Sequence, residues 1–249
     1  DLAEKGSFGD EAVLVIDSVD RLCREPSLEA MELLITLFKK EEEASQNVLK
    51  LHAGDSITGT KYYTLFKGPK HVSPDSVMMN QICFDAFTIG NHEFDDGDSG
   101  LADFIDDLHA DACNTPVISA NTKLSKNSAA VMGEKIQPYV IINKGGIDIA
   151  IVGITIGYKT AISSNPDNGT TFLSELETAQ ITINKLTRLG VNHIVLLTHN
   201  QYQRDIDMAR PQIFDPSLGS DGEYRNLTDA EIREAASGLE PEETEGPPP

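Results

Sequence analysis

The sequence predicts a mixed α/β sandwich with polar loops gathered along one edge. Three observations favour this fold class. Short apolar runs rich in β-branched residues alternate with segments of helical periodicity. Two strand-like segments flank Lys144-Gly145-Gly146, which is the signal of an antiparallel hairpin. Polar blocks follow directly after several apolar runs, at the position where open α/β sheets place their active sites.

In the first third of the chain, strands and helices are predicted in alternation. Residues 1–12 carry little signal, whereas residues 12–16 (AVLVI) are typical of a buried strand. Pro26-Ser27 precedes a predicted helix whose apolar residues recur at helical spacing: Leu28, Met31, Leu34 or Ile35, and Phe38. Residues 47–53 form the next predicted strand. Ser73-Pro74 begins a helix that continues to Ile82, because a capping Ser precedes a Pro at the first helical position.

The same alternation continues to about residue 200. The elements predicted are a strand over 84–89, a helix from 99 or 100 to 109, a short strand over 116–120, hairpin strands over 139–142 and 147–154, a helix over 173–189 and a strand over 193–197. The helix predicted to end at residue 109 has one apolar face, which contains Leu101, Phe104, Ile105 and Leu108. Gly190 is expected to end the last helix.

Periodicity stops after about Arg210. Prolines and glycines interrupt the pattern, and the last stretch is rich in Glu and Pro. We therefore predict one domain over residues 1–210 and an acidic, disordered tail over 211–249, with a weak helix over 229–237. No apolar run approaches the roughly 18 residues that span a membrane. No signal-peptide pattern is recognised at the start of the chain, which opens with Asp1.

The formal net charge of −20 limits the kinds of molecule that the chain is expected to bind. Such a surface repels phosphate backbones, so a general role in binding nucleic acid is not expected. A nucleotide substrate is compatible with this charge, because bound metal ions reverse the local field.

Cys23, Cys83 and Cys113 lack Cys-x-x-Cys spacing, so neither a zinc knuckle nor a redox motif is indicated. We expect these cysteines to be small buried hydrophobes, with at least one free thiol. Asn168-Gly169-Thr170 and Asn226-Leu227-Thr228 are glycosylation sequons that matter only in a secretory compartment.

Two polar blocks carry the strongest functional signal. The first runs from His52 to Gly59 (HAGDSITG) and the second from Gly90 to Asp95 (GNHEFD), each directly after a predicted strand. His199 ends a third predicted strand. An Asp, an Asn and a His gathered at one sheet edge suit divalent metals bound through oxygen and imidazole. This chemistry indicates hydrolysis of phosphate esters.

Each residue type has a place in that chemistry. The two carboxylate oxygens of Asp55 suit a ligand that bridges two metal ions. Asn91 offers a carbonyl oxygen and His199 an imidazole nitrogen. We expect His92 to face the leaving group or a phosphoryl oxygen. We expect both Asn91 and His92 to contact the substrate. Asp95, three residues on, is placed to hydrogen-bond the other ring nitrogen of His92.

Each signal has a structural alternative when taken alone. Gly54-Asp55 is compatible with a simple turn, Asn91-His92 with a left-handed turn, and His199 with a capping or core histidine. Three strand ends that each deliver a ligand-type residue favour a metal site over these alternatives.

The two blocks closely resemble the 5'-nucleotidase branch of the calcineurin-like metallophosphoesterases. The resemblance rests on AGDSITGT with KYYTLFKG and on FDAFTIGNHEFD, and it extends over roughly residues 27–209, including Ile118–Asn121, Ile149–Ile154, Ser163–Pro166 and Val191–His199. It implies a four-layer αββα sandwich. It also implies that Asp55 is the bridging ligand, that Asn91 and His199 bind one metal, and that His92 and Asp95 form the catalytic dyad.

The activity implied by the resemblance is dephosphorylation of nucleoside 5'-monophosphates or related nucleotides, usually outside the cytoplasm, on the cell surface or in the secretory route. The cofactors implied are two divalent ions, such as zinc or manganese.

The chain departs from the family pattern at both ends. An Asp-x-His after the first strand and a downstream Gly-His-x-His are missing, since no His precedes His52 or follows His199. We expect the chain to begin just past the first motif, and the family's C-terminal nucleotide-binding domain is also missing. One metal keeps Asp55, Asn91 and His199, and the other keeps only Asp55. The sequence therefore supports at most one bound ion and predicts low or no phosphatase activity for this polypeptide alone.

Three hypotheses remain open at this point. The first is a metallophosphoesterase of the 5'-nucleotidase type, incomplete or divergent. The second is a non-catalytic protein that kept the fold for binding or scaffolding. The third is that the sequence represents part of a longer protein. Retention of the His92 and Asp95 pair favours the enzyme, because a scaffold does not need that pair.

Overall fold

The structure is a computed structural model, and it describes residues 4–8, 11–16, 28–59, 61–67, 72–110, 112–128, 135–210, 212–215, 217, 223–226, 228 and 230–231. The chain divides into two units, Asp1–Asn200 and Gln201–Pro249. Each unit is described by itself.

Two main sheets form the centre of the first unit. The larger sheet has the order β1-β2-β3-β4-β5-β7, with β1 (Glu4–Phe8), β2 (Glu11–Ile16), β3 (Leu49–His52), β4 (Ala86–Thr88), β5 (Val117–Ile118) and β7 (Ile136–Gln137). All neighbours in it are parallel except β1 and β2. The smaller sheet, in the order β11-β9-β8, contains β8 (Tyr139–Lys144), β9 (Ile147–Thr155) and β11 (His193–His199). A separate pair joins β6 (Thr122–Lys123) to β10 (Thr171–Phe172).

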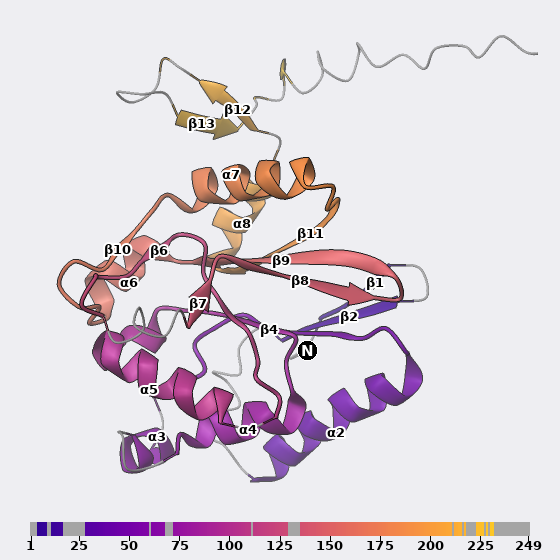
Figure 1. Cartoon of the computed structure of the whole chain (residues 1–249), viewed down its shortest axis with the longest axis vertical. Helices are drawn as coiled ribbons and strands as arrows, with labels where there is room; N and C mark the ends of the chain where they lie inside the picture. Colours follow the sequence, from indigo (N-terminus) through magenta and orange to yellow (C-terminus); the bar gives the residue numbers. More distant parts are fainter. Residues whose placement is uncertain are drawn as a thin grey trace, which may run out of the picture. The chain divides into compact units, whose positions relative to one another are not determined.

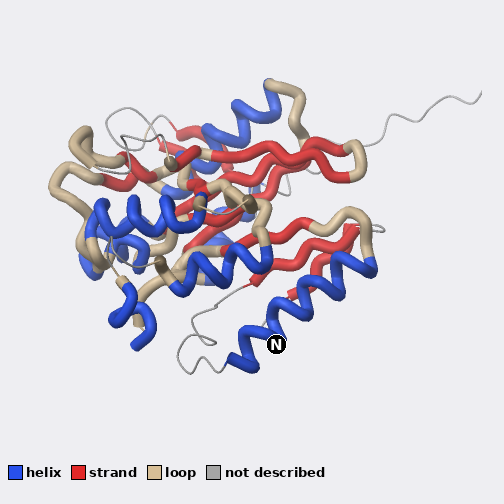
Figure 2. Tube along the Cα trace, turned by 60° about the horizontal axis from the view of Figure 1, so that its bottom comes forward, coloured by secondary structure: helices blue, strands red, loops and turns tan. Residues whose placement is uncertain are grey.

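Helices cover the outer sides of the two sheets. Figure 1 shows α2 (Leu28–Ala44), α4 (Pro74–Ile82) and α5 (Gly97–His109) on one side of the strands, and α7 (Glu175–Arg188) beyond β8 and β9. Figure 2 shows the strands enclosed between these helices. The remaining helices of this unit are short, namely α3 (Lys61–Phe66), α6 (Gly157–Ser163) and the 3-10 turn η1 (His92–Phe94).

The apolar core has two parts that correspond to these layers. One part packs helices on the larger sheet and includes Phe38 of α2, Phe87 of β4 and Phe104 of α5. The other lies between the sheets and includes Leu51 of β3 and Ile151 of β9. All residues of β3 and β4 are buried, including the polar residues Lys50, His52 and Thr88. The predicted four-layer αββα sandwich is confirmed.

Local sequence accounts for most element boundaries. Leu101, Phe104, Ile105 and Leu108 are all buried on one face of α5, as their spacing predicts. Gly190 follows α7 with φ of +87°, a left-handed conformation that glycine adopts without steric cost. The predicted hydroxyl cap by Ser73 is wrong. Pro74 begins α4, but the Ser73 hydroxyl makes no cap hydrogen bond and lies near Asp75 instead.

Several short elements were not predicted from the sequence. These are β1, α3, η1, β6, β7, α6 and β10, together with α8 (Tyr202–Ala209) in the second unit. Most are too short to show a period, and β1 is defined by its pairing with β2. In the second unit, β12 (Gln212–Asp215) and β13 (Glu223–Asn226) form an antiparallel pair within the range predicted to be a tail. Most of the helix predicted over 229–237 and all of 232–249 lie outside the described residues.

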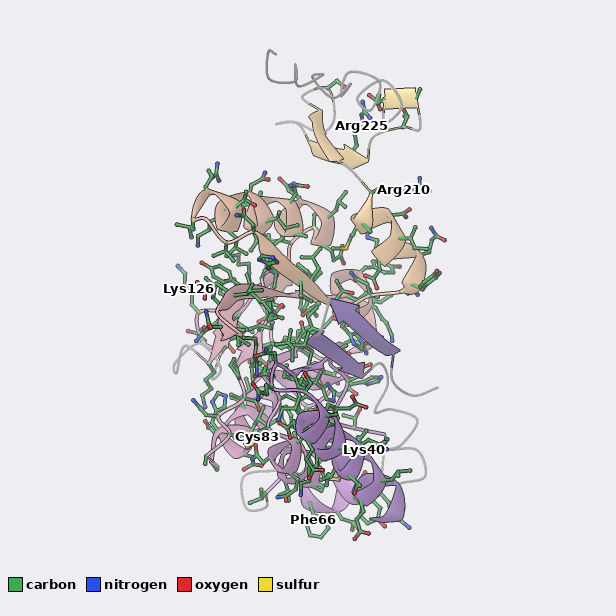
Figure 3. The ribbon with its side chains drawn as sticks, turned by 90° about the vertical axis from the view of Figure 1, so that its right-hand side faces the viewer. Lys40, Phe66, Cys83, Lys126, Arg210 and Arg225 are labelled. Atoms are coloured by element: carbon green, nitrogen blue, oxygen red, sulfur yellow. A yellow bond between two sulfur atoms is a disulfide. The ribbon has the colours of Figure 1, made fainter. Side chains whose placement is uncertain are left out.

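A disulfide joins Cys83 and Cys113, which corrects the expectation that these cysteines are buried hydrophobes. Their Cα atoms are 5.0 Å apart, and the bridge ties the C-terminal end of α4 to the segment that follows α5. Cys83, labelled in Figure 3, is exposed, and Cys113 is half-buried. Spacing could not reveal the pair because 30 residues separate the two positions. Cys23 lies outside the described residues.

Within the described part of the chain, every helix is too short or too polar to cross a lipid bilayer.

We predict that the double substitution Cys83→Ser with Cys113→Ser lowers the free energy of unfolding by about 3 kcal/mol, because the bridge closes a loop of intermediate length in the unfolded chain. Urea unfolding followed by circular dichroism measures the change. Reductant should destabilise the wild type by a similar amount and leave the double variant unchanged. Equal stability of the two proteins under oxidising conditions would contradict the prediction.

Candidate active site

The predicted site residues lie at the carboxyl ends of strands from both sheets. Asp55 follows β3, Asn91 and His92 follow β4, and His199 is the last residue of β11. Since β3 and β4 are parallel neighbours, the loops that follow them leave the same edge of the larger sheet. The contact between Asp55 and His199 joins this edge to the end of the smaller sheet.

Asp55 and His199 are in direct contact. The Oδ2 atom of Asp55 lies 3.0 Å from Nε2 of His199. The other ring nitrogen, Nδ1, lies 2.6 Å from the carbonyl oxygen of Ala53 and donates to it. This second bond fixes the ring so that Nε2 faces the Asp55 carboxylate. A metal-binding histidine has the same arrangement, with one nitrogen on a carbonyl and the other on the ligand side.

His92 and Asp95 form the pair that the sequence predicts. Nδ1 of His92 lies 2.7 Å from Oδ2 of Asp95. The intervening turn η1 brings positions i and i+3 to the same side. The backbone N–H of His92 donates to Oδ1 of Asp55 at 2.9 Å, and its Nε2 lies 3.9 Å from Oδ2 of Asp55. The His92 side chain is 43% exposed, so its free nitrogen is open to a substrate.

The side chain of Asn91 is buried, with no hydrogen-bond partner for either its amide oxygen or its amide nitrogen. A buried amide without partners is rare, because desolvating it costs about 1–3 kcal/mol. The left-handed turn considered for this residue is wrong, since Asn91 has φ of −81°. A buried amide oxygen free of protein donors, next to Asp55 and His92 in the fold, suits a cation ligand.

The charges of Asp55 and His199 support one another. Burial alone would raise the pKa of Asp55, but the hydrogen bond and charge of His199, with the N–H of His92, outweigh burial and lower it. Burial alone would lower the pKa of His199, but the bond to Asp55 and its negative charge raise it. Both shifts favour a carboxylate facing an imidazolium. A cation held by Nε2 of His199 would compete with that proton, so we expect metal affinity to fall at acidic pH.

Glu93 holds the two site loops together. Its fully buried carboxylate accepts from the backbone N–H groups of Asp55 and Gly90 on one oxygen, at 3.0 and 2.7 Å. The other oxygen accepts from the N–H of Ser56 at 2.7 Å. Burial and the charge of Asp55 raise the pKa of Glu93, whereas these hydrogen bonds favour the carboxylate. All of these neighbours donate, so the ionised form satisfies them.

Two glycines let the same loops approach each other. A Cβ on Gly54 would lie 2.6 Å from the backbone nitrogen of Gly90, and one on Gly90 would lie 2.3 Å from Oδ1 of Asp55. A side chain at either position would therefore separate the two loops. Asp55 itself has φ of +55°, a left-handed conformation that is tolerated by Asp but costs about 1–2 kcal/mol. Such strain is typical of residues held for function.

His52, the last residue of β3, stabilises the loop that contains Gly54 and Asp55. Its Nδ1 accepts from the N–H of Gly54 at 3.1 Å, and its ring packs edge-on against Phe84. Burial and, to a smaller extent, the charge of His199 lower the pKa of His52 to about 3. His52 is therefore neutral at physiological pH and is a structural residue of the Gly54 turn.

A third loop braces the His92 and Asp95 pair. The backbone N–H of Asn165 donates to the carbonyl of Phe94 at 3.0 Å, and its side-chain Nδ2 donates to the carbonyl of Asp95 at 2.7 Å. Sequence reasoning gave no role to Glu93 or Asn165, although both lie in stretches that carry the family resemblance. Their polarity inside otherwise matched motifs was the signal that could have revealed them.

The described residues contain no group of three or more His, Cys, Asp and Glu side chains arranged to hold a metal ion. The arrangement around Asp55 has two such residues, completed by the Asn91 amide. This donor set of one carboxylate, one imidazole and one amide oxygen fits a single divalent cation.

Comparison with known proteins finds relatives that are named as 5'-nucleotidases. The chain is 43% identical over 165 residues to NAD 5'-nucleotidase of Haemophilus influenzae, a match that covers 66% of this chain and 26% of that protein. It is 40% identical over 165 residues to snake venom 5'-nucleotidase of Crotalus adamanteus, with the same coverage of 66% and 26%. No family model matches the chain.

Solved structures give the same result. The structure of the Haemophilus influenzae NAD nucleotidase matches with a TM-score of 0.65 and 39% identity, over 72% of this chain and 34% of that one. A 5'-nucleotidase precursor from Thermus thermophilus matches with a TM-score of 0.63 and 34% identity, over 71% and 32%.

The chain belongs to the 5'-nucleotidase family. This confirms the resemblance to the 5'-nucleotidase branch of the metallophosphoesterases. The chain spans about a quarter of the length of these curated relatives. In this 5'-nucleotidase family member, Asp55, Asn91, His92, Asp95 and His199 occupy one edge of the four-layer fold.

We predict that Glu93→Gln lowers the free energy of unfolding by about 2 kcal/mol, because one of its two acceptor oxygens becomes an amide NH2 group, a donor that faces backbone N–H groups. The affinity for Zn²⁺ or Mn²⁺, measured by calorimetry, should fall as well, since Asp55 loses its anchor. Glu43→Gln, the same change at an exposed position of α2, is the control and should alter neither quantity. Wild-type stability and affinity in Glu93→Gln would show that this carboxylate does not organise the site.

Proposed function

We propose that this chain supplies part of a metal-dependent hydrolase of nucleoside 5'-monophosphates or related nucleotide phosphate esters. The observation that carries the proposal is the convergence of Asp55, His199 and the unpartnered Asn91 amide beside the His92 and Asp95 pair. The relatives' names point to the same chemistry, because they are nucleotidases.

In this proposal, the oxygens of Asp55 and Asn91 and the Nε2 atom of His199 hold a divalent cation such as zinc or manganese. When bound, the cation lowers the pKa of a water molecule and neutralises phosphoryl oxygens. The ring of His92 donates to the leaving group or to a phosphoryl oxygen, and the hydrogen bond to Asp95 fixes the orientation of this ring. Asn91 and His92 also contact the substrate. The fully buried side chain of Phe94 helps to exclude water from the site.

We further propose that this chain alone is weakly active. Two metal ions about 3.5–4 Å apart are the usual requirement of such chemistry, whereas the described residues contain no group of three or more His, Cys, Asp and Glu side chains that could hold even one ion without the Asn91 amide. The same observation favours a second candidate, a binding or scaffold protein that keeps the fold and one cation without turnover.

An extracellular, cell-surface or secretory location is part of the proposal. The Cys83–Cys113 disulfide supports it, because structural disulfides persist in oxidising compartments. A relative named as a venom protein is in keeping with such a location.

We expect nucleotide hydrolysis by this chain, measured as phosphate release from AMP with added zinc or manganese, to be far below that of a full-length relative assayed in parallel. Any residual rate should fall by about 100-fold or more in His92→Asn, because the general acid is lost. Turnover equal to the relative's would refute the claim of weak activity. Residual turnover that His92→Asn leaves unchanged would favour the scaffold candidate.

Asp55→Asn should weaken Zn²⁺ or Mn²⁺ binding by at least tenfold in calorimetry, since the cation loses its charged ligand. Asp148→Asn is the matched control, because Asp148 is exposed at the opposite end of β9 from the site. Unchanged affinity in Asp55→Asn would remove Asp55 from the ligand set.

A further inference from the structure

The loop between α6 and β10 carries a sequon in an exposed turn. Asn168, Gly169 and Thr170 lie in a turn closed by the N–H of Thr170, which donates to the carbonyl of Asp167 at 2.9 Å. Asn168 is the second residue of this turn, and Gly169 is the third, with φ of +98°. Both central residues are exposed, so the Asn168 side chain stands at the tip of the turn.

The residues on both sides of the tip are tied to the body of the unit. The N–H of Asp167 donates to Oδ1 of Asp98 at 3.0 Å, and the N–H of Asp98 donates to Oδ1 of Asp167 at 3.3 Å. The hydroxyl of Thr170 donates to Oδ2 of Asp98 at 2.7 Å and accepts from the N–H of Ser125 at 2.9 Å. Figure 3 labels Lys126, the neighbour of Ser125 in that second loop. A bulky group on Asn168 would therefore not disturb the anchors of this loop.

We propose that Asn168 is an acceptor for an N-linked glycan when the chain is made in a secretory compartment. The co-reactant is an oligosaccharide carried on a lipid pyrophosphate. The Nδ2 atom of Asn168 attacks the anomeric carbon, a C–N bond forms, and the bond from that carbon to the pyrophosphate oxygen breaks. The lipid pyrophosphate leaves with the electron pair, and the amide loses one proton. Asn-x-Thr with Gly in the middle is the acceptor pattern for this transfer.

The glycan proposal rests on the secretory location proposed above, which the disulfide supports. The disulfide between the exposed Cys83 and the half-buried Cys113 forms in oxidising compartments, where glycan transfer also occurs. The proposal does not depend on the proposed hydrolase, because no residue of the metal site takes part.

The order of events follows from Thr170. The acceptor pattern requires a hydroxyl two residues after the Asn, but in the folded chain this hydroxyl is engaged by Asp98 and Ser125. Transfer therefore takes place before the loop docks, and the folded protein is a poor acceptor. The second sequon begins at Asn226, whose side chain lies outside the described residues. Glycan occupancy at Asn226 is measured in the same experiment and compared with that at Asn168.

The test is secretion of the full 249-residue chain from a eukaryotic cell line, with analysis of both cells and medium. We expect a wild-type mobility step that a glycan-removing amidase abolishes, and a peptide in which amidase treatment converts Asn168 to Asp. The glycan on the Asn168 peptide should be lost in Thr170→Val, the mobility shift should shrink by one glycan in Asn168→Gln and in Thr170→Val, and both should persist in Thr170→Ser, which keeps the sequon and the hydroxyl. Asn168→Gln removes an exposed amide, and an intact Cys83–Cys113 bridge verifies that it folds.

A second arm tests the order of events. Bacterially produced chain is offered to microsomal membranes that contain lipid-linked oligosaccharide, either folded or after denaturation and reduction. We expect modification of Asn168 only in the unfolded chain. An unmodified Asn168 peptide in the secreted wild type, whether or not Asn226 carries a glycan, would overturn the proposed site. Efficient modification of the folded chain would overturn the proposed order.

Discussion

The structure of the site depends on one buried carboxylate. Glu93 accepts hydrogen bonds from backbone N–H groups of two loops that are far apart in the sequence, at Asp55 and Ser56 and at Gly90. A carboxylate with both oxygens satisfied inside the protein fixes the distance between these loops more rigidly than apolar packing does, since hydrogen bonds are directional. The position of Asp55, and with it the contact to His199, follows from this clamp.

The hydrogen bonds to Glu93 can form only because the backbones of the two loops come close together. Gly54 and Gly90 leave no room for a Cβ between them, and Asp55 accepts a left-handed backbone to turn its carboxylate toward His199 and the N–H of His92. The close approach of the two loop backbones is therefore the condition for the side-chain contacts of the site. Its strain and its unpartnered Asn91 amide are compatible with a fold that is completed by a bound cation.

The loop over 164–172 connects the site to the surface. Asn165 donates to the carbonyls of Phe94 and Asp95, whereas the exposed Asn168 lies at the turn of the same loop. The Asp98 and Asp167 bonds between these two positions make the loop rigid. One loop can therefore brace the His92 and Asp95 pair and still present a side chain to solvent, and a modification at its tip leaves the brace in place.

The alternation of strands and helices could be predicted from the chain alone, as could the three strand ends that carry Asp55, His92 and His199. These features are local, because apolar periodicity and motif spacing are written along the chain. The three-dimensional fold was needed to reveal the role of Glu93, the brace at Asn165, the disulfide and the neutral state of His52. Each of these depends on which distant groups surround a buried polar atom, and proximity across the fold leaves no periodic signal in the sequence.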